Sequence, residues 1–375
     1  MRVLVVLKEP PLAEGGAPGK CAVALLRGLA AHGVDVRAIA ARQVFSLPGD
    51  PPADLPVEVV PVAPEPPGSR SRVRRLRRPA GGIARDDFLT RIREAARDAD
   101  VLHLEETETA WCDLGVAVPS LVHVHYLVRR DRPLGWPWES RFRHGVELWL
   151  GERAAARRHR RLVASSPLIA EALRARSPHA EVVHAPLALD PAYYEPAPLD
   201  GPPTVGIIGT AAWEPTAGAI RRLVASVWPE IRRRVPDARL LVAGRGVESL
   251  GLPDTPGVEL AGDVPSAAEF LRGLSALVYP LERGSGMKVK VLEAIASGVP
   301  VVTTPAGAEG VEAEAGVLVE TDDRGLAAAA AELLANSPLR RRAGQAARAA
   351  FERRYAPEPA TRPLVELYRR MAERR

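Results

Sequence analysis

The sequence predicts an α/β protein with two facing Rossmann-like domains. Short apolar runs, such as residues 2–7 and 204–208, alternate with longer amphipathic stretches, which is the pattern of parallel strands joined by helices. The same strand–helix–strand order restarts in the second half of the chain, after a segment rich in proline and glycine, 195–203. At 375 residues the chain is long enough for each domain to bury its own core.

The composition is that of a soluble globular protein, with 46% hydrophobic and 26% charged residues and a modest net charge of +5. Its two cysteines form no Cys-x-x-Cys pair, so neither a disulfide framework nor a zinc site is expected, and we predict no metal and no cofactor. There is no apolar stretch of membrane-spanning length and no signal-peptide pattern, so we expect a cytoplasmic protein.

The first half of the chain reads as alternating strands and helices. Strands are expected at 2–7, 34–40, 100–104, 119–125 and 162–166, with a further one from 182, and helices at 20–32, 86–97, 145–158 and 167–176. The stretch 46–67 is rich in proline and is expected to hold one strand and long loops.

Two nucleotide-binding motifs can be excluded. Gly19-Lys20 is not part of a P-loop, because Glu14 stands where the first glycine belongs and Cys21 where a serine or threonine would bind magnesium. The dinucleotide pattern Gly-x-Gly-x-x-Gly fails at Gly284, since its sixth position is Val289.

A basic run occupies residues 69–79 and holds arginines throughout 70–78. Such a run can bind nucleic acid or an anionic membrane. It contains no aromatic residue for base stacking, so a nucleic acid partner is not expected. We expect a solvated, mobile segment, with an anionic acceptor or a membrane surface as the alternatives.

The second half repeats the pattern. Strands are expected at 204–208, 238–243, 276–279, 299–303 and 316–319, and helices at 216–235, 286–297, 323–335, 339–353 and 359–374.

The segment 279–311 is the strongest candidate for a binding site. It reads as strand, glycine loop (Arg283-Gly284-Ser285-Gly286), helix and buried strand, and ligands of such domains bind where strands end and helices begin. At about 100° per residue, Gly286, Lys290 and Glu293 fall on one stripe of the helix. This stripe suits a nucleoside diphosphate, because amides and a cation bind phosphates and a carboxylate accepts hydrogen bonds from the ribose hydroxyls.

An ordinary surface Lys–Glu pair is the alternative interpretation of this stripe. The lysine content favours the binding site, since two of only four lysines in the chain fall in this one turn; the four are Lys8, Lys20, Lys288 and Lys290.

The residues Gly-Ser-Gly-Met-Lys-Val-Lys-Val-Leu-Glu-Ala at 284–294, followed by Gly-Ala-Glu-Gly at 307–310, resemble the donor-site segment of the group 1 glycosyltransferases (glycosyltransferase family 4). The resemblance implies the GT-B fold, with the active site in the interdomain cleft. It implies an acceptor domain at 1–195, joined by the C-terminal helix 359–375, and a nucleotide-sugar donor domain at 204–356.

The resemblance also implies residue roles. The diphosphate would be held by amides of Gly284, Ser285, Gly286 and Met287 and by Arg283 and Lys290, and the ribose by Glu293. The donor sugar would meet Ala308, Glu309 and Gly310, with His125 and the loop of Gly15 and Gly16 on the opposite wall. The residues bordering the nucleoside would be Gly209, Arg245 and Val264, although their segments are also typical of plain turns.

Two departures from the family pattern stand out. The family places basic residues after the strand that ends near Gly209, but here no base occurs until Arg221, so Arg283 and Lys290 must supply that charge. Many members have a second glutamate where this chain has Ser285, and the role of Glu282 is left open.

The expected function is a retaining, metal-independent glycosyltransferase that uses a nucleotide-diphosphate sugar. The alternatives are a nucleotide-sugar 2-epimerase of the same fold and a non-catalytic nucleotide-sugar-binding protein. For the acceptor, Glu105, Glu106 and Glu108 favour a small cationic molecule, whereas the run 70–78 favours a phospholipid. A small soluble or natural-product acceptor is preferred.

Overall fold

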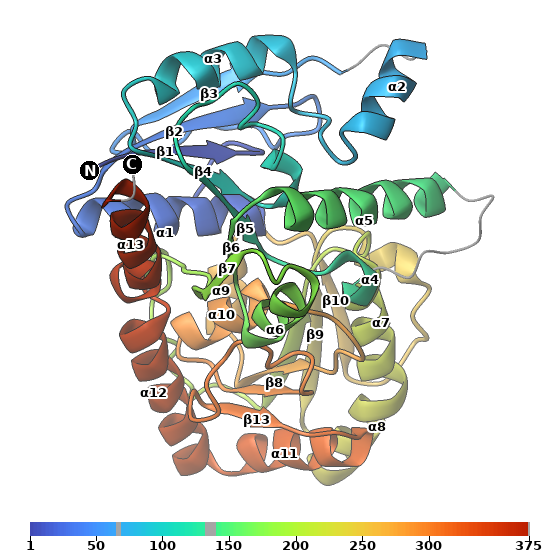
Figure 1. Ribbon diagram of the computed structural model, residues 1–375. Helices are drawn as coiled ribbons and strands as arrows, with labels where there is room; N and C mark the ends of the chain where they lie inside the picture. Colours follow the sequence, from blue (N-terminus) through green and yellow to red (C-terminus); the bar gives the residue numbers. More distant parts are fainter. Residues whose placement is uncertain (65–68, 132–139, 374–375) are drawn as a thin grey trace. The chain divides into compact units, whose positions relative to one another are not determined.

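The computed structural model describes residues 1–64, 69–131 and 140–373. The end of the predicted stretch 46–67 and the last residues of the predicted helix 359–375 lie outside these ranges. The chain forms two compact units (Figure 1). Unit 1 comprises Met1–Asp190 and Ala356–Arg375, and unit 2 comprises Pro191–Tyr355, so the proline-rich segment 195–203 lies inside unit 2.

Unit 1 is built on a parallel sheet of seven strands in the order β3-β2-β1-β4-β5-β6-β7. The strands are β1 (Arg2–Leu7), β2 (Asp35–Arg42), β3 (Val57–Pro61), β4 (Val101–Glu105), β5 (Ser120–Val124), β6 (Arg161–Ala164) and β7 (Glu181–His184). The helices are α1 (Ala17–Ala31), α2 (Ser69–Arg77), α3 (Asp86–Ala96), α4 (Val128–Asp131), α5 (Ser140–Arg158), α6 (Pro167–Arg176) and α13 (Pro357–Glu373).

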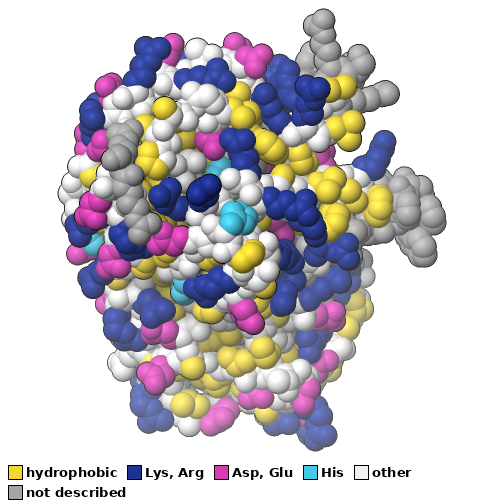
Figure 2. Space-filling model, viewed as in Figure 1, with side chains coloured by type: hydrophobic (Ala, Val, Ile, Leu, Met, Phe, Trp, Pro, Cys, Tyr) yellow, Lys and Arg dark blue, Asp and Glu magenta, His cyan; other side chains and the backbone are white. Residues whose placement is uncertain are grey.

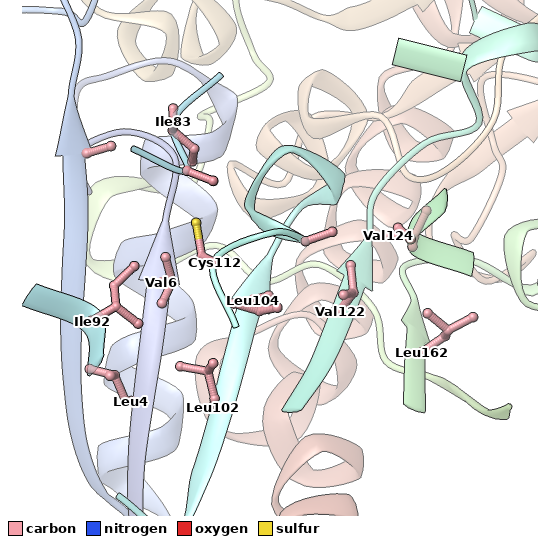
Figure 3. Close-up of a cluster of buried hydrophobic side chains, with 14 of the residues drawn as sticks. Leu4, Val6, Ile83, Ile92, Leu102, Leu104, Cys112, Val122, Val124 and Leu162 are labelled. Carbon is pink, nitrogen blue, oxygen red and sulfur yellow. The ribbon is translucent and has the colours of Figure 1, made fainter. Parts of the chain in front are cut away.

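The unit 1 sheet is buried on both faces. Leu102 and Leu104 of β4 and Val122 and Val124 of β5 point into one apolar layer, which α3 and α6 cover (Figure 3). Alternate residues of the same strands point into the opposite layer, where α1 and α13 pack against each other. A sheet covered on both faces requires apolar strands, as the sequence predicts.

Unit 2 holds a parallel sheet of six strands in the order β10-β9-β8-β11-β12-β13. The strands are β8 (Thr204–Ile208), β9 (Arg239–Ala243), β10 (Val258–Gly262), β11 (Ala276–Tyr279), β12 (Val301–Thr303) and β13 (Val317–Val319). The helices are α7 (Glu214–Arg222), α8 (Trp228–Arg234), α9 (Ala267–Arg272), α10 (Val289–Ala296), α11 (Asp323–Ala335) and α12 (Ser337–Arg354). The predicted pair of Rossmann-like α/β domains is therefore confirmed.

Three helices differ from the sequence predictions. The helix expected from 286 begins at Val289, because Gly286 has φ +69°, which a right-handed helix does not contain. The helix expected over 216–235 is interrupted by a π-helical turn, Leu223–Val227, just before Pro229, which has no N–H to donate. The basic run 69–79, for which no helix was predicted, forms the helix α2.

Within the described part of the chain, none of the helices combines the length and apolar character needed to cross a bilayer.

Candidate active site

The strand ends of unit 2 meet in a closely packed row of glycines. The amide of Gly209, after β8, donates to the carbonyl of Ala243 at 3.0 Å, and the amide of Gly244, after β9, donates to that of Gly262 at 2.6 Å. A Cβ atom placed on Gly244 would lie 2.0 Å from the carbonyl oxygen of Gly209. The backbones can approach this closely only because these positions lack side chains.

Lys290 lies directly on this row. It is the second residue of α10, and a Cβ atom placed on Gly209 would lie 2.2 Å from its Cε and 3.1 Å from its Nζ. The ammonium group is therefore at the C-terminal end of β8, where the sequence itself has no basic residue. Arg221, the next base along the chain, is half exposed and stands 4.0 Å from Glu214.

Lys288 has a different position. Its Nζ donates to the carbonyls of Ser285, at 3.0 Å, and Gly286, at 2.5 Å. This lysine therefore closes the glycine loop on itself. Ser285 and Met287 are buried in the loop, whereas Arg283 is exposed.

Glu293 is only 5% exposed, so it does not belong to a surface Lys–Glu pair. The hydroxyl of Tyr194 donates to its Oε1 at 3.1 Å, and Arg348 donates to the carbonyl of Tyr194 at 2.7 Å. Sequence reasoning missed both partners. The available signal was an aromatic pair, Tyr193-Tyr194, inside a segment otherwise typical of a linker.

The loop after β12 carries the residues predicted to meet the donor sugar. The amide of Ala308 donates to the carbonyl of Thr304 at 3.0 Å, so that amide is already engaged within the loop. The buried hydroxyl of Tyr355 accepts from the amide of Glu312 at 2.8 Å and donates to the carbonyl of Gly310 at 3.3 Å. Glu309 is partly buried in the same loop.

The two other residues predicted to border the nucleoside lie just beyond β9 and β10. Arg245 is exposed, with its Nε 3.7 Å from Oδ2 of Asp263, and Val264 is partly buried. Their roles, like those of all the other predicted site residues, stay predictions.

In unit 1, His125 follows β5 beside Glu105, the last residue of β4. Nε2 of His125 lies 2.8 Å from Oε1 of Glu105. The other carboxylate oxygen, Oε2, is 2.6 Å from Nε2 of His103 and 3.1 Å from Nδ1 of His123. Burial raises the pKa of Glu105, but the histidines lower it by more, so this pKa lies well below its usual range.

Glu106 and Glu108 bind Lys8, which follows β1. Nζ of Lys8 lies 2.6 Å from Oε2 of Glu106 and 3.3 Å from Oε1 of Glu108. Burial lowers the pKa of Lys8, but the two carboxylates raise it by more, so this pKa lies well above its usual range. Together with Glu105 these glutamates were expected to form an open acidic surface for a cationic acceptor. Each instead contacts basic side chains of the same unit.

The Gly15–Gly16 loop lies at the same edge of the unit 1 sheet. Gly15 closes a turn by donating to the carbonyl of Leu12 at 3.1 Å, and Gly16 directly precedes α1. A Cβ atom placed on Gly16 would lie 3.8 Å from Oε1 of Glu9, the neighbour of Lys8. The structure thus gathers this loop, Glu105 and His125 in unit 1, and Lys290, Gly209 and Glu293 in unit 2.

His103, Glu105 and His123 are the kinds of side chains that bind metal ions, and their ligand atoms all lie within 4.8 Å of one another. Metal–ligand bonds to histidine and carboxylate measure about 2.0–2.2 Å, so an ion between two such atoms holds them about 3 Å apart or more. The 2.6 Å separation between His103 and Glu105 is too short for that and fits a direct hydrogen bond.

Two family models match the chain. The model of the group 1 glycosyl transferases matches residues 202–336, and that of the glycosyl transferase 4-like domain matches residues 16–187. Comparison with curated protein sequences gives no match.

Solved structures share the fold over the full length. Sucrose-phosphate synthase from Thermosynechococcus elongatus has a TM-score of 0.73 at 18% identity, with 100% of both chains covered. WaaG, a glycosyltransferase involved in lipopolysaccharide biosynthesis, has a TM-score of 0.64 at 16% identity, with 98% of each chain covered. Alr3699/HepE of Anabaena, solved with UDP and glucose, has a TM-score of 0.65 at 14% identity, covering 97% of this chain and 98% of its own.

The two family models together span most of the chain, and its fold is similar to those of WaaG and sucrose-phosphate synthase over nearly the whole length; the protein belongs to the group 1 glycosyltransferases and has the GT-B fold.

Proposed function

We propose that the protein transfers a sugar from a nucleotide-diphosphate donor to an acceptor hydroxyl, with retention of anomeric configuration and without a metal ion or cofactor. One observation carries the proposal. The Lys290 ammonium lies on Gly209 at the end of β8, and Glu293 is buried one turn further along the same helix. The structure of HepE with UDP and glucose supports a nucleotide-sugar donor.

Unit 2 binds the donor in this proposal. The leaving diphosphate gains negative charge as the glycosidic bond breaks, and Lys290, Arg283, the amides of 284–287 and the start of α10 stabilise it. Loss of one such donor typically costs about 3 kcal/mol in the transition state. Glu293, held by Tyr194, accepts hydrogen bonds from the ribose hydroxyls.

Unit 1 contributes His125 and the Gly15–Gly16 loop to the reacting sugar and the acceptor. The closed ion pairs of Glu106 and Glu108 with Lys8 remove the main argument for a cationic acceptor. A small soluble acceptor bearing a hydroxyl group is still our proposal, and a lipid acceptor is the alternative that α2 suggests.

The helix α2 has the features of a contact with an anionic membrane surface. Val73 and Leu76 are 48% and 83% exposed on it, and no acidic residue occurs within 69–78. Basic and apolar side chains gather around α2 and α5 on one face (Figure 2). Basic helices with exposed apolar side chains bind anionic lipid headgroups through charge and shallow insertion.

The test is a screen of nucleotide sugars against soluble and lipid acceptors, read by mass spectrometry, with the anomeric configuration of the product determined by NMR. We expect transfer with retention, unchanged by EDTA. Lys290→Ala and Glu293→Ala should each lose about 100-fold in kcat/KM or more, while Arg221→Ala should not. Isomerisation of a donor without transfer would overturn the proposal in favour of an epimerase, and donor binding without turnover in favour of a binding protein.

A further inference from the structure

Polar side chains interrupt one apolar layer of unit 1. His103 and Glu105 of β4 and His123 of β5 point toward the layer of α1 and α13, which is otherwise filled by residues such as Val5 and Leu364. They are 0%, 5% and 2% exposed. Burying polar groups is unfavourable unless they are paired, so a stripe of this kind implies a specific use.

The strand pairing brings these side chains together around one carboxylate. Glu105 is directly opposite His123 in the β4–β5 ladder, and His103 and His125 are each two residues away on the same face. The ring centroids of His123 and His125 are 4.5 Å apart in an edge-to-face arrangement. His103 and His123 are hydrogen-bonded to Oε2 of Glu105. Nε2 of His125 alone faces Oε1, at an ion-pair distance of 2.8 Å and outside hydrogen-bond geometry.

The chain of contacts continues to the C-terminal helix. Nδ1 of His103 is hydrogen-bonded to the hydroxyl of Tyr368 on α13, which is 0% exposed. His103 therefore links the Tyr368 hydroxyl to the Glu105 carboxylate through its two ring nitrogens. Burial raises the pKa of Tyr368 well above its usual range, so its hydroxyl keeps the proton.

We propose that Glu105 is a positioning residue for His125: it holds the ring through Nε2, leaving Nδ1 as the nitrogen that meets the substrate, while His103 and Tyr368 fix the carboxylate. The role of His125 in sugar transfer rests on the proposed function. The claim that Glu105 holds the His125 ring does not depend on it. In metal sites, side chains that orient a histidine through its second nitrogen commonly contribute about 10- to 100-fold to activity, and we expect an effect of that order for Glu105.

The charges around His125 agree with this geometry. Burial lowers the pKa of His125, but Glu105 raises it by more, with help from Glu106, so this pKa lies above the ordinary 6.5. Burial lowers the pKa of His123 to about 4, so His123 is neutral near pH 7. The titratable and charged groups of unit 1 around His125 are Glu105 of β4, Glu106 and Glu108 after β4, His123 of β5, Lys8 after β1 and, through His103, Tyr368 of α13.

The experiment measures the pKa of His125 by NMR of the ¹⁵N-labelled imidazoles, assigned with His125→Gln. In Glu105→Gln the carboxylate charge is lost, so we expect the His125 pKa to fall from its wild-type value. Tyr368→Phe removes one hydroxyl and should lower the His125 pKa by less than Glu105→Gln does. The control is Glu152→Gln, which removes a carboxylate of the same unit, 3% exposed, that binds Arg176 at 2.6 Å; it should leave the His125 pKa unchanged.

Steady-state kinetics distinguish a positioning role of Glu105 from a purely structural one. Glu105→Gln should lower kcat about 10- to 100-fold with little change in the donor KM, and the pH midpoint assigned to His125 should move down with its NMR pKa. An unchanged His125 pKa in folded Glu105→Gln overturns the proposal. Should that variant not fold, an unchanged pKa and kcat in Tyr368→Phe overturn it.

Two further outcomes distinguish this inference from the proposed function. If the protein transfers no sugar at all, the NMR titration still decides whether Glu105 holds His125. The His125 pKa could fall as expected while His125→Gln keeps full transfer activity. That result would overturn the positioning role and would mean that the polar residues of β4 and β5 only stabilise the fold.

Discussion

The contact between Lys290 and Gly209 joins two residues that the sequence separates by about half the length of unit 2. Lys290, and not Lys288, shares a helical stripe with Gly286 and Glu293, and the two lysines have different positions in the structure. Lys288 binds carbonyls of its own loop, whereas Lys290 crosses to the end of β8. Gly209 is needed for this crossing because any side chain there would occupy the path of the lysine.

We therefore expect Gly209→Ala to act as an indirect Lys290 variant. The new methyl group would lie 2.2 Å from Cε of Lys290 and 2.7 Å from Cγ2 of Thr216, so the flexible lysine must move away. Affinity for a nucleoside diphosphate, measured by calorimetry, should fall about tenfold or more, because a displaced cation no longer meets the phosphates. Gly201→Ala is the matched control, since nothing lies within 4 Å of its added methyl group. Equal affinities for both variants would contradict a phosphate role for Lys290.

Among the elements, α13 packs closely against α1. Gly28 of α1 is buried, and a Cβ atom on it would lie 2.3 Å from the carbonyl oxygen of Pro357 and 2.7 Å from Cγ2 of Thr361. The same helix carries Tyr368, whose hydroxyl is hydrogen-bonded to His103. His103 belongs to the histidine cluster, which is the group of His103, His123 and His125 around Glu105. The docking of α13 therefore contributes both to the core of unit 1 and to the surroundings of His125.

Gly28→Ala should destabilise the protein by about 1–3 kcal/mol, the usual effect of overpacking a close contact. Gly218→Ala, in α7, adds a methyl group with nothing within 4 Å, and replacing a helical glycine there should be neutral or stabilising by about 0.5–1 kcal/mol. The stabilities of the two variants are compared by thermal unfolding. A Gly28→Ala protein as stable as Gly218→Ala would mean that α13 is not packed on α1 as described.

The exposed apolar face of α2 yields a second prediction at the level of elements. Leu76→Glu should weaken binding to phosphatidylserine vesicles about tenfold or more, since it removes an apolar contact and adds repulsion, and wild-type binding should fall with added salt. Leu260→Glu is the control, because Leu260 is 45% exposed on β10 of unit 2. Vesicle sedimentation measures both. Equal binding of the two variants would show that α2 is not the contact.

Across the whole molecule, the residues that we propose bind the diphosphate belong to unit 2, and the histidine cluster belongs to unit 1. A nucleoside diphosphate without its sugar should therefore slow hydrogen exchange at 209–212 and 283–290 and leave β4 and β5 unchanged. UDP, GDP and ADP are tried in turn, each against the Lys290→Ala control. Protection centred on β4 and β5 would contradict the assignment of the donor to unit 2.

The sequence by itself determined the fold class and predicted which segment binds the donor. Apolar periodicity located strands such as Thr204–Ile208 and helices such as Pro167–Arg176, because a parallel sheet buried on both faces requires continuous apolar strands. Boundaries near glycine and proline were less accurate, as at Gly286 and Pro229, where backbone conformation decides. The family motif of 284–310 could be recognised because the residues that form it are adjacent in the chain.

Only the tertiary structure decided which side chains meet. Tyr194 and Glu293 are 99 residues apart and His103 and Tyr368 are 265 apart, so no local pattern links them. Histidines in buried strands were a signal that buried partners exist, because unpaired polar groups are costly in a core. Their identity depends on sheet order and helix docking, which place Glu105 opposite His123 and α13 beneath β4. For the same reason the chain needs no basic residue next to Gly209: the fold brings Lys290 there.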